Sequence, residues 1–207
     1  MSELSNFQHI FQKGSADSGR TIIALHGTGG DEGSLLPITR VVAPGASILS
    51  VRGKVLENGA PRFFRRLAEG VFDMEDLHFR TSELAEFIHQ AATTYNFETK
   101  DLFAIGYSNG ANIASSLMLS FPGLLRGGVL FRAMVPFVPP TSPDLTGTHV
   151  FMAQGKHDPI VPLEQAEDLC LMMRSFGASV ELKWIEMDHR ITRAELNDAS
   201  EWLAKQA

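Results

Sequence analysis

Ser108 lies at the centre of a pentapeptide that can place a reactive hydroxyl at a tight turn. Residues 106–110 read Gly-Tyr-Ser-Asn-Gly and match the pattern G-x-S-x-G. An apolar run at residues 101–107 predicts a strand before the serine, and residues 109–120 predict a helix after it. In this strand–turn–helix context a serine is exposed as a nucleophile, and the flanking glycines avoid clashes of Cβ atoms. The alternative is a serine that only caps the helix.

A serine nucleophile needs a general base, and the sequence offers one after the last predicted strand. In G-x-S-x-G sites the chain order is serine, then acid, then histidine. Of the seven histidines, only His149, His157 and His189 follow Ser108. His149 falls inside a predicted strand, and His157 is next to the best candidate acid. His189 directly follows the strand predicted at residues 179–185, so it is the predicted base.

The acid is expected after the preceding strand, at residues 148–154, where Asp158 follows within a few residues. Its predicted role is to hold the imidazole in the correct tautomer and to stabilise the imidazolium. Asp144 lies in a proline-rich loop before that strand, and Asp188 is joined to His189 itself, so both are weaker candidates. Because each of the three residues follows a predicted strand in the expected order, the sequence predicts a triad.

Acyl transfer also needs hydrogen-bond donors for the oxyanion of the tetrahedral intermediate. The backbone N–H of Asn109 is one predicted donor, and that of Thr28, in the glycine-rich loop at residues 26–32, is the other. A dinucleotide-binding loop is excluded, because G-x-G-x-x-G spacing would need glycine where Glu32 stands. The next strand also runs into Arg52 rather than an acidic residue.

The elements that must position these residues follow one another in a regular order. Strands are predicted at residues 21–26, 46–51, 101–107, 128–131, 148–154 and 179–185. Helices are predicted from Asp31 to Val42 and at residues 75–95, 109–120, 162–176 and 192–205, with a loop of four prolines at 135–143. This alternation predicts one α/β domain over residues 1–207, with a mostly parallel central sheet flanked by helices on both faces. Sites in such sheets gather at the carboxyl ends of the strands.

The composition excludes several other classes of protein. Hydrophobic residues make up 44% of the 207 residues and charged residues 20%, as in an ordinary globular domain. A formal net charge of -6 is unfavourable for nucleic-acid binding, which needs clustered Lys and Arg. The opening Met-Ser-Glu-Leu-Ser-Asn has no basic segment followed by an apolar run, and no stretch resembles a membrane helix. We therefore expect a cytoplasmic protein without membrane contact.

The single cysteine, Cys170, cannot form an internal disulfide or a cysteine-rich zinc site. It lies in an apolar helical stretch and is interpreted as a small buried side chain. No other cluster of metal-ligand residues is convincing, so no metal is expected. This argues against a metal-dependent hydrolase.

Together these motifs resemble the α/β-hydrolase superfamily and, within it, the phospholipase/carboxylesterase family, a lid-less group that includes acyl-protein thioesterases. The resemblance covers residues 22–202 and rests on Leu-His-Gly-Thr-Gly at 25–29, the pentapeptide around Ser108, Asp-Pro-Ile-Val-Pro at 158–162 and the turn at His189. Residues 52–59 and 63–66 are similar to a subgroup of bacterial carboxylesterases. The resemblance implies an α/β-hydrolase fold without a large lid domain, ester or thioester hydrolysis, no cofactor and a homodimer.

The sequence departs from the family pattern at three places. Asp188 stands where the family usually has glycine, and its carboxylate is expected either to raise the His189 pKa or to compete with Asp158. Asn109 replaces the glutamine common in thioesterases. The loop that begins at Arg132 replaces the small residues usual there. The last two differences favour a carboxylesterase over an acyl-protein thioesterase.

Candidates for substrate contacts lie in residues 52–66, which hold five basic residues and one acidic residue. Because this segment follows a predicted strand, Arg62, Phe63 and Arg65 are candidates to line a pocket, with arginine binding a carboxylate or phosphate. The alternative is a solvated helix whose arginines pair with acidic residues at 69–76. Arg132 and Met134, after the next strand end, are further candidates.

The predicted function is hydrolysis of short- to medium-chain carboxylic esters, small-molecule substrates, through an acyl-enzyme on Ser108. No large lid is expected, although the proline-rich loop offers a short one. A thioesterase or a lysophospholipase would use the same triad and stays an alternative. A non-catalytic binding protein of the same fold is a further alternative that the complete triad disfavours.

Overall fold

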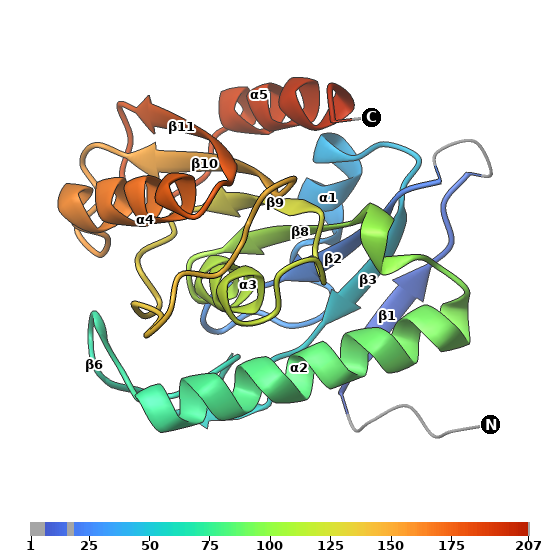
Figure 1. Cartoon of the computed structure of the whole chain (residues 1–207), viewed down its shortest axis with the longest axis horizontal. Coiled ribbons are helices and arrows are strands. Elements are labelled where there is room, and N and C mark those ends of the chain that lie inside the picture. The colour runs from blue at the N-terminus through green and yellow to red at the C-terminus, as the bar shows by residue number, and fades with distance from the viewer. Residues whose placement is uncertain (1–6, 16–18, 207) are drawn as a thin grey trace.

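A sheet of seven strands forms the centre of the molecule, which we describe from a computed structural model covering residues 7–15 and 19–206 (Figure 1). The opening residues 1–6, whose composition argued against a secretion signal, lie outside the described part. The strands in spatial order are β1 (His9–Gln12), β3 (Ser47–Val51), β2 (Thr21–Leu25), β8 (Leu102–Tyr107), β9 (Gly127–Phe131), β10 (His149–Gly155) and β11 (Ser179–Ile185). All neighbours are parallel except β1 and β3. The predicted α/β class with a mostly parallel sheet is confirmed.

The register of the sheet brings the carboxyl ends of its strands to one edge. Leu25 of β2 pairs with Val51 of β3 and with Gly106 of β8. Tyr107 of β8 then pairs with Phe131 of β9, and β10 and β11 end level with each other. The loops that follow these strands therefore emerge side by side.

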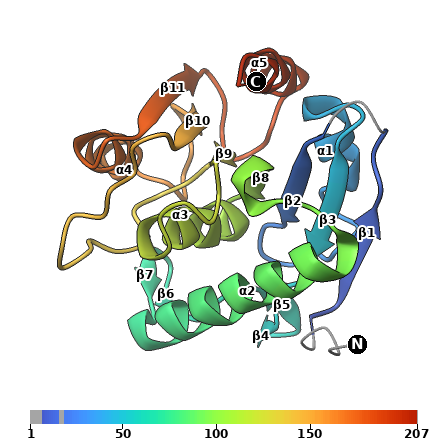
Figure 2. The ribbon, with the colours of Figure 1, turned by 45° about the vertical axis from the view of Figure 1, so that its right-hand side comes forward.

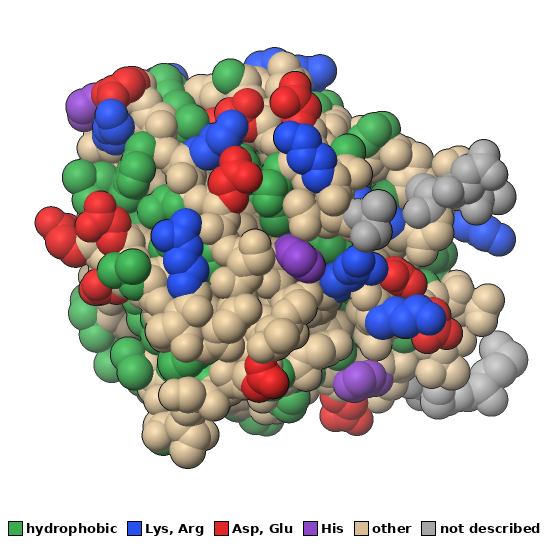
Figure 3. All heavy atoms as spheres, turned by 45° about the horizontal axis from the view of Figure 1, so that its top comes forward, with side chains coloured by type: hydrophobic (Ala, Val, Ile, Leu, Met, Phe, Trp, Pro, Cys, Tyr) green, Lys and Arg blue, Asp and Glu red, His purple; other side chains and the backbone are tan. Residues whose placement is uncertain are grey.

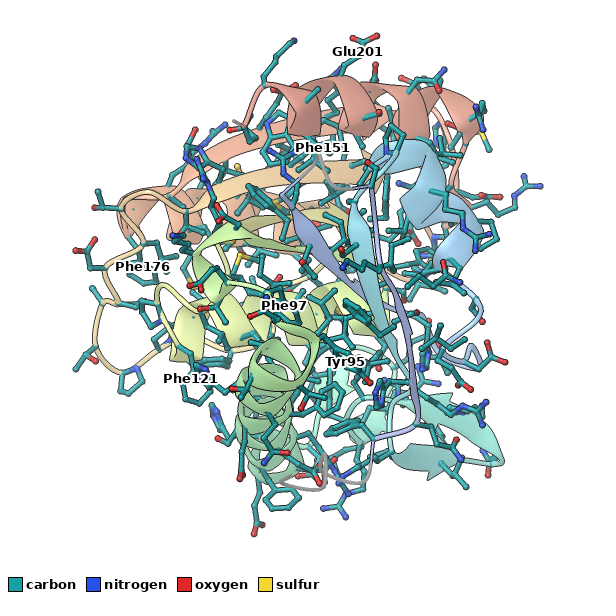
Figure 4. The ribbon with its side chains drawn as sticks, turned by 90° about the vertical axis from the view of Figure 1, so that its right-hand side faces the viewer. Tyr95, Phe97, Phe121, Phe151, Phe176 and Glu201 are labelled. Carbon is teal, nitrogen blue, oxygen red and sulfur yellow. The ribbon has the colours of Figure 1, made fainter. Side chains whose placement is uncertain are left out.

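Helices cover both faces of the sheet, as the alternating sequence predicted (Figures 1 and 2). They are α1 (Leu36–Val42), α2 (Met74–Tyr95), α3 (Asn109–Ser120), α4 (Leu163–Ser175) and α5 (Arg193–Ala204), with a short 3₁₀ turn at Thr99–Asp101. α1 and α5 pack on one face, where the ring of Phe151 of β10, labelled in Figure 4, lies 5.7 Å from that of Trp202 of α5. α2, α3 and α4 pack on the other face. Alternate side chains of each strand pack into the hydrophobic cores on the two faces of the sheet, because successive side chains point to opposite faces.

Two local predictions need correction. The first helix begins at Leu36 rather than at Asp31, because the Asp31 carboxylate accepts hydrogen bonds from Gly33 N and Ser34 Oγ and so closes a separate turn. The second correction is strand β1, which was not predicted. It pairs in antiparallel register along the edge of β3 and extends the sheet by one strand.

The segment between β3 and α2 forms two hairpins, not a solvated helix. The first joins β4 (Val55–Glu57) to β5 (Ala60–Arg62), and the second joins β6 (Arg66–Ala68) to β7 (Val71–Phe72). The turn of the first is Asn58-Gly59, with φ of 51° and 83°. These values suit the tight hairpin turn for which Asn-Gly is the strongest sequence signal.

Among the residues that the structure describes, no large lid covers the sheet edge, as expected. Residues 132–148 form a proline-rich loop without helix or strand.

No helix in the described residues is long and apolar enough to cross a membrane. On the face seen in Figure 3, Lys and Arg side chains alternate with Asp and Glu, so this face carries no continuous basic patch.

Candidate active site

Ser108 occupies a strained turn between β8 and α3, with φ 53° and ψ −114°. Such backbone angles on a non-glycine residue cost about 1–3 kcal/mol and cluster at functional sites. A Cβ atom at Gly106 would lie 2.6 Å from the Gly110 carbonyl oxygen, and one at Gly110 only 1.9 Å from that of Leu25. Gly106 is therefore needed for α3 to pack against the end of β8, and Gly110 for α3 to pack on β2. The Ser108 side chain makes no capping hydrogen bond to α3, so the simple helix cap is not what this serine provides.

His189 is held by a buried carboxylate. Its Nδ1 donates to Asp158 Oδ2 over 2.7 Å, and the Asp158 side chain is only 1% exposed. The other oxygen, Oδ1, accepts from the backbone N–H groups of Ile160 and Val161 at 2.8 and 3.2 Å. Tyr107 donates its hydroxyl to the His189 carbonyl oxygen at 3.0 Å. The imidazole is thus fixed by its ring nitrogen and by its own main chain.

Asp188 does not compete for the imidazole. Its carboxylate accepts from Arg190 N and Nε at about 3 Å and is 40% exposed. Hydrogen bonds from the Arg190 side chain lower the pKa of Asp188 below its usual range. Asp144 lies in an exposed turn, where it accepts from Thr146 N. Asp158 is therefore the carboxylate that the fold brings to His189.

The glycine-rich loop after β2 is fastened from three sides. Gly29 N donates to Pro61 O in the first hairpin over 2.9 Å. His26 donates from Nδ1 to Gly27 O and accepts the Gly53 N–H at Nε2, over 2.7 and 3.0 Å. Burial lowers the pKa of His26, which favours the neutral ring that these two bonds require. The hairpins and β3 thus hold the loop in one conformation.

The two predicted oxyanion donors face the same cavity. Thr28, Ser108, Asn109 and His189 all line a cavity of about 300 Å³. Asn109 is the first residue of α3, whose N–H has no acceptor within the helix. Within the described residues, the Thr28 N–H also makes no hydrogen bond. Both donors are available to a group in the cavity.

The predicted substrate contacts divide into two groups. Arg62 and Met134 line the cavity. Arg65 does not, because its side chain is 58% exposed and pairs with Asp73 and Asp76. Phe63 is buried behind the site, where its ring packs on His26 and its N–H donates to Asn109 Oδ1. Phe63 and Arg65 thus do not line this cavity.

Arg132, a predicted substrate contact, lines the cavity, but its side chain binds groups of the protein itself. The side chain is fully buried and pairs with Glu195, with Nη1 2.5 Å from Oε1. Its remaining N–H groups donate to the carbonyl oxygens of Ala153, Asp188 and Arg190. Its donors are therefore used by the protein itself. They hold the main chain on both sides of His189.

Several contributors to the site were missed in the sequence. Asn112, on the first turn of α3, lines the cavity, and its Oδ1 accepts from Met134 N over 3.0 Å. Ile160 and Val161 line the opposite wall. Glu195 had a sequence signal: with Thr192 it forms a capping box, the T-x-x-E pattern at a helix start. Nothing local indicated that this carboxylate also meets Arg132.

Two expectations about chemistry can be compared with the structure. Cys170 is buried, and desolvation raises the pKa of its thiol, in line with its interpretation as a packing residue. Across the part of the chain that is described, no group of three or more His, Cys, Asp or Glu side chains could hold a metal ion.

A parallel sheet, a strained serine between a strand and a helix, and a histidine–carboxylate pair at later strand ends define the class of α/β-hydrolases. The family model of the phospholipase/carboxylesterase family matches residues 8–207. The chain therefore belongs to this family of hydrolases, as the motifs suggested.

Similar proteins agree with this assignment. A putative hydrolase of Bacillus subtilis (strain 168), MhqD, is 46% identical over 195 residues, which are 94% of this chain and 96% of that protein. The crystal structure of the Bacillus cereus carboxylesterase is 47% identical, with a TM-score of 0.95 over 98% of this chain and 96% of the other. A carboxylesterase from Mesorhizobium loti is 29% identical, with a TM-score of 0.91 over 99% and 97% of the two chains.

Proposed function

We propose that this hydrolase is a serine carboxylesterase that cleaves short- to medium-chain carboxylic esters through an acyl-enzyme on Ser108. The observation that carries the proposal is the meeting of three features at one cavity. They are the strained Ser108 turn, the imidazole of His189 and the Asp158 carboxylate 2.7 Å from that imidazole.

In the proposed reaction His189 takes the Ser108 proton as Oγ attacks the ester carbonyl carbon. The negative charge that develops on the carbonyl oxygen is stabilised by the N–H groups of Thr28 and Asn109. Asp158 stabilises the imidazolium, which then donates its proton to the leaving alkoxide. Water, deprotonated by His189, attacks the acyl-serine in the same way and releases the carboxylic acid.

The test compares wild type with Ser108→Ala on p-nitrophenyl acetate, butyrate and octanoate. Loss of a triad serine is expected to lower kcat about 10⁴- to 10⁶-fold. Ser82→Ala is the matched control, because Ser82 is exposed on α2 and its hydroxyl donates to His78 O. It should retain the wild-type rate. Thermal unfolding of both variants shows that each is folded.

Equal rates for wild type and Ser108→Ala would contradict the assignment of the nucleophile. Absence of turnover in wild type on every ester would favour the binding-protein alternative. Parallel assays with butyryl thioesters compare the thioesterase alternative, since the same triad can cleave both bonds. We expect the oxygen esters to show the higher kcat/KM.

A further inference from the structure

Two amide side chains on the first turn of α3, both of residues that line the cavity, use their oxygens to bind backbone N–H groups. The Asn109 oxygen accepts from Phe63 N over 2.7 Å, and the Asn112 oxygen accepts from Met134 N over 3.0 Å. A backbone N–H can be met only by the oxygen of an amide, so the orientation of both groups is fixed. The Asn109 Nδ2 is buried without a hydrogen-bond partner. The Asn112 Nδ2 likewise makes no hydrogen bond to any described residue.

A pair of arginines on the hairpins adds positive charge to the same cavity. Arg62 and Arg66 both line it, and both pair with one carboxylate, Glu57, at 3.2 and 2.9 Å. Two guanidinium groups that share one carboxylate leave a surplus of one positive charge. Arg62 Nη2 and both Nη atoms of Arg66 make no hydrogen bond within the described chain. The Arg62 side chain is 4% exposed, and this burial lowers the pKa of Arg62.

Acidic side chains are scarce on the cavity wall. Glu69 is the one acidic side chain among the lining residues, and it lies exposed at the turn of the β6–β7 hairpin. Solvent and salt screen an exposed charge of this kind. Apolar side chains supply much of the remaining lining, namely Phe72, Met134, Ile160 and Val161. The wall therefore combines apolar side chains with unused guanidinium donors and one surplus positive charge.

The ligand group that complements this wall accepts hydrogen bonds, donates none and carries one negative charge. A carboxylate has these properties, and its two oxygens match the planar fork of an arginine. We propose that the cavity selects esters that carry a second, free carboxylate, bound by Arg66 and Arg62 with the amide group of Asn112. This proposal rests on the proposed esterase activity, because it names the substrate class of the same site.

The test uses two pairs of substrates that differ only in one charged group. In the first pair the carboxylate is in the acyl part: mono-p-nitrophenyl adipate is compared with p-nitrophenyl adipamate. In the second it is in the alcohol part: 4-carboxyphenyl butyrate is compared with 4-carbamoylphenyl butyrate. We expect kcat/KM about tenfold higher for the acid in one pair, which also identifies the half of the substrate that meets the arginines.

Variants connect the preference with the named residues. Arg66→Gln should remove most of the preference, measured as the ratio of kcat/KM for the acid to that for the amide, since the charge is lost. Glu69→Gln should increase the preference. Arg65→Gln is the matched control, because Arg65 lies on the same segment but outside the cavity.

The assays distinguish failure of the carboxylate proposal from failure of the esterase proposal. If the amides are hydrolysed as well as the acids in both pairs, the carboxylate proposal is wrong and the esterase proposal stands. An acid preference that survives in Arg66→Gln and Arg62→Gln, both shown to be folded by thermal unfolding, would also overturn it. Absence of hydrolysis for all four esters would contradict the esterase proposal and the carboxylate preference with it.

Discussion

Asp158 and Asp188 both lie close to His189, one in space and the other in the chain, and their partners decide their roles. Asp158 is buried, receives two backbone N–H bonds at one oxygen and meets the imidazole with the other. Asp188 is turned outward to Arg190. A carboxylate that is desolvated and oriented in this way interacts far more strongly with an imidazolium than an exposed neighbour does.

We predict that the same aspartate-to-asparagine change has a large effect on kcat at Asp158 and a small one at Asp188. Asp158→Asn should lower kcat about 10⁴-fold, because the amide neither fixes the required tautomer nor stabilises the imidazolium. Asp188→Asn should change kcat by less than about threefold, since an exposed carboxylate contributes little through solvent. Steady-state kinetics on p-nitrophenyl butyrate provides the measurement. A larger loss in Asp188→Asn than in Asp158→Asn would reverse the assignment of the acid.

The positions of Ser108, Asp158 and His189 could be predicted because each follows a strand whose end the sequence reveals. The parallel register then places all such ends at one edge. The environment of Arg132 could not be predicted in this way. It also follows a strand, but the carboxylate that pairs with its side chain is that of Glu195, 63 residues away in the chain. Local sequence carries no information on such a pair.

Between elements, the Arg132–Glu195 pair connects the end of β9 to the start of α5. Arg132 has a φ of 59°, which is unfavourable for a non-glycine residue. The surrounding bonds to Ala153, Asp188 and Arg190 hold it there. Because two of these acceptors flank His189, the ion pair determines the shape of the loop that carries the imidazole.

This arrangement predicts that stability and activity separate in a set of variants. Arg132→Met should lower the free energy of unfolding by about 3–5 kcal/mol, because the buried Glu195 loses its partner. Arg132→Met combined with Glu195→Gln should recover much of that loss, since no buried charge is left and the glutamine can still cap α5. In both the single and the double variant, kcat should stay about 10²-fold below that of wild type, with KM nearly unchanged. The reason is that the loop carrying His189 has lost the hydrogen bonds from the Arg132 guanidinium.

Urea unfolding and steady-state kinetics measure the two effects. Arg190→Met serves as the control, because that side chain is 77% exposed and only its carbonyl oxygen meets Arg132. It should keep kcat within about threefold. Recovery of kcat together with stability in the double variant would show that the loop does not depend on Arg132.

The elements themselves were predictable to different degrees. Strands such as β2 and β8 were found because they are buried on both faces and therefore continuously apolar. Strand β1 was missed because its four residues are all only partly buried and pair along one edge. The first hairpin had a signal in Asn58-Gly59, but the basic residues around it suggested a solvated helix. Their ion pairs in fact connect the hairpins to one another and to α2.

For the molecule as a whole, the sheet edge and the two hairpins enclose a small and open site. The hairpins supply Arg62, Arg66 and Phe72 to one wall, and the loop after β10 supplies Ile160 and Val161. The volume of about 300 Å³ is at the lower end of small-molecule sites, which span about 300–1,000 Å³. With no large lid above it, the cavity has a fixed capacity for the acyl chain.

We therefore predict a limited gain from longer acyl chains in the proposed esterase. Each methylene that the cavity buries contributes about 0.8 kcal/mol, or about a fourfold increase in kcat/KM at most. The increase should stop once the cavity is full, so p-nitrophenyl esters should give a maximum between about four and eight carbons and lower values beyond about twelve. Initial rates measured below the critical micelle concentration provide the series.

Two variants test whether the cavity sets this limit. Met134→Ala enlarges the cavity wall and should move the maximum to longer chains, whereas Met74→Ala, an exposed position outside the cavity, should leave it unchanged. A lipase that opens a lid at an interface would behave differently, because its rate would increase above the micelle concentration. A steady increase to sixteen carbons, or such interfacial activation, would contradict a small open site, since neither can arise where the walls are fixed and no lid has to move.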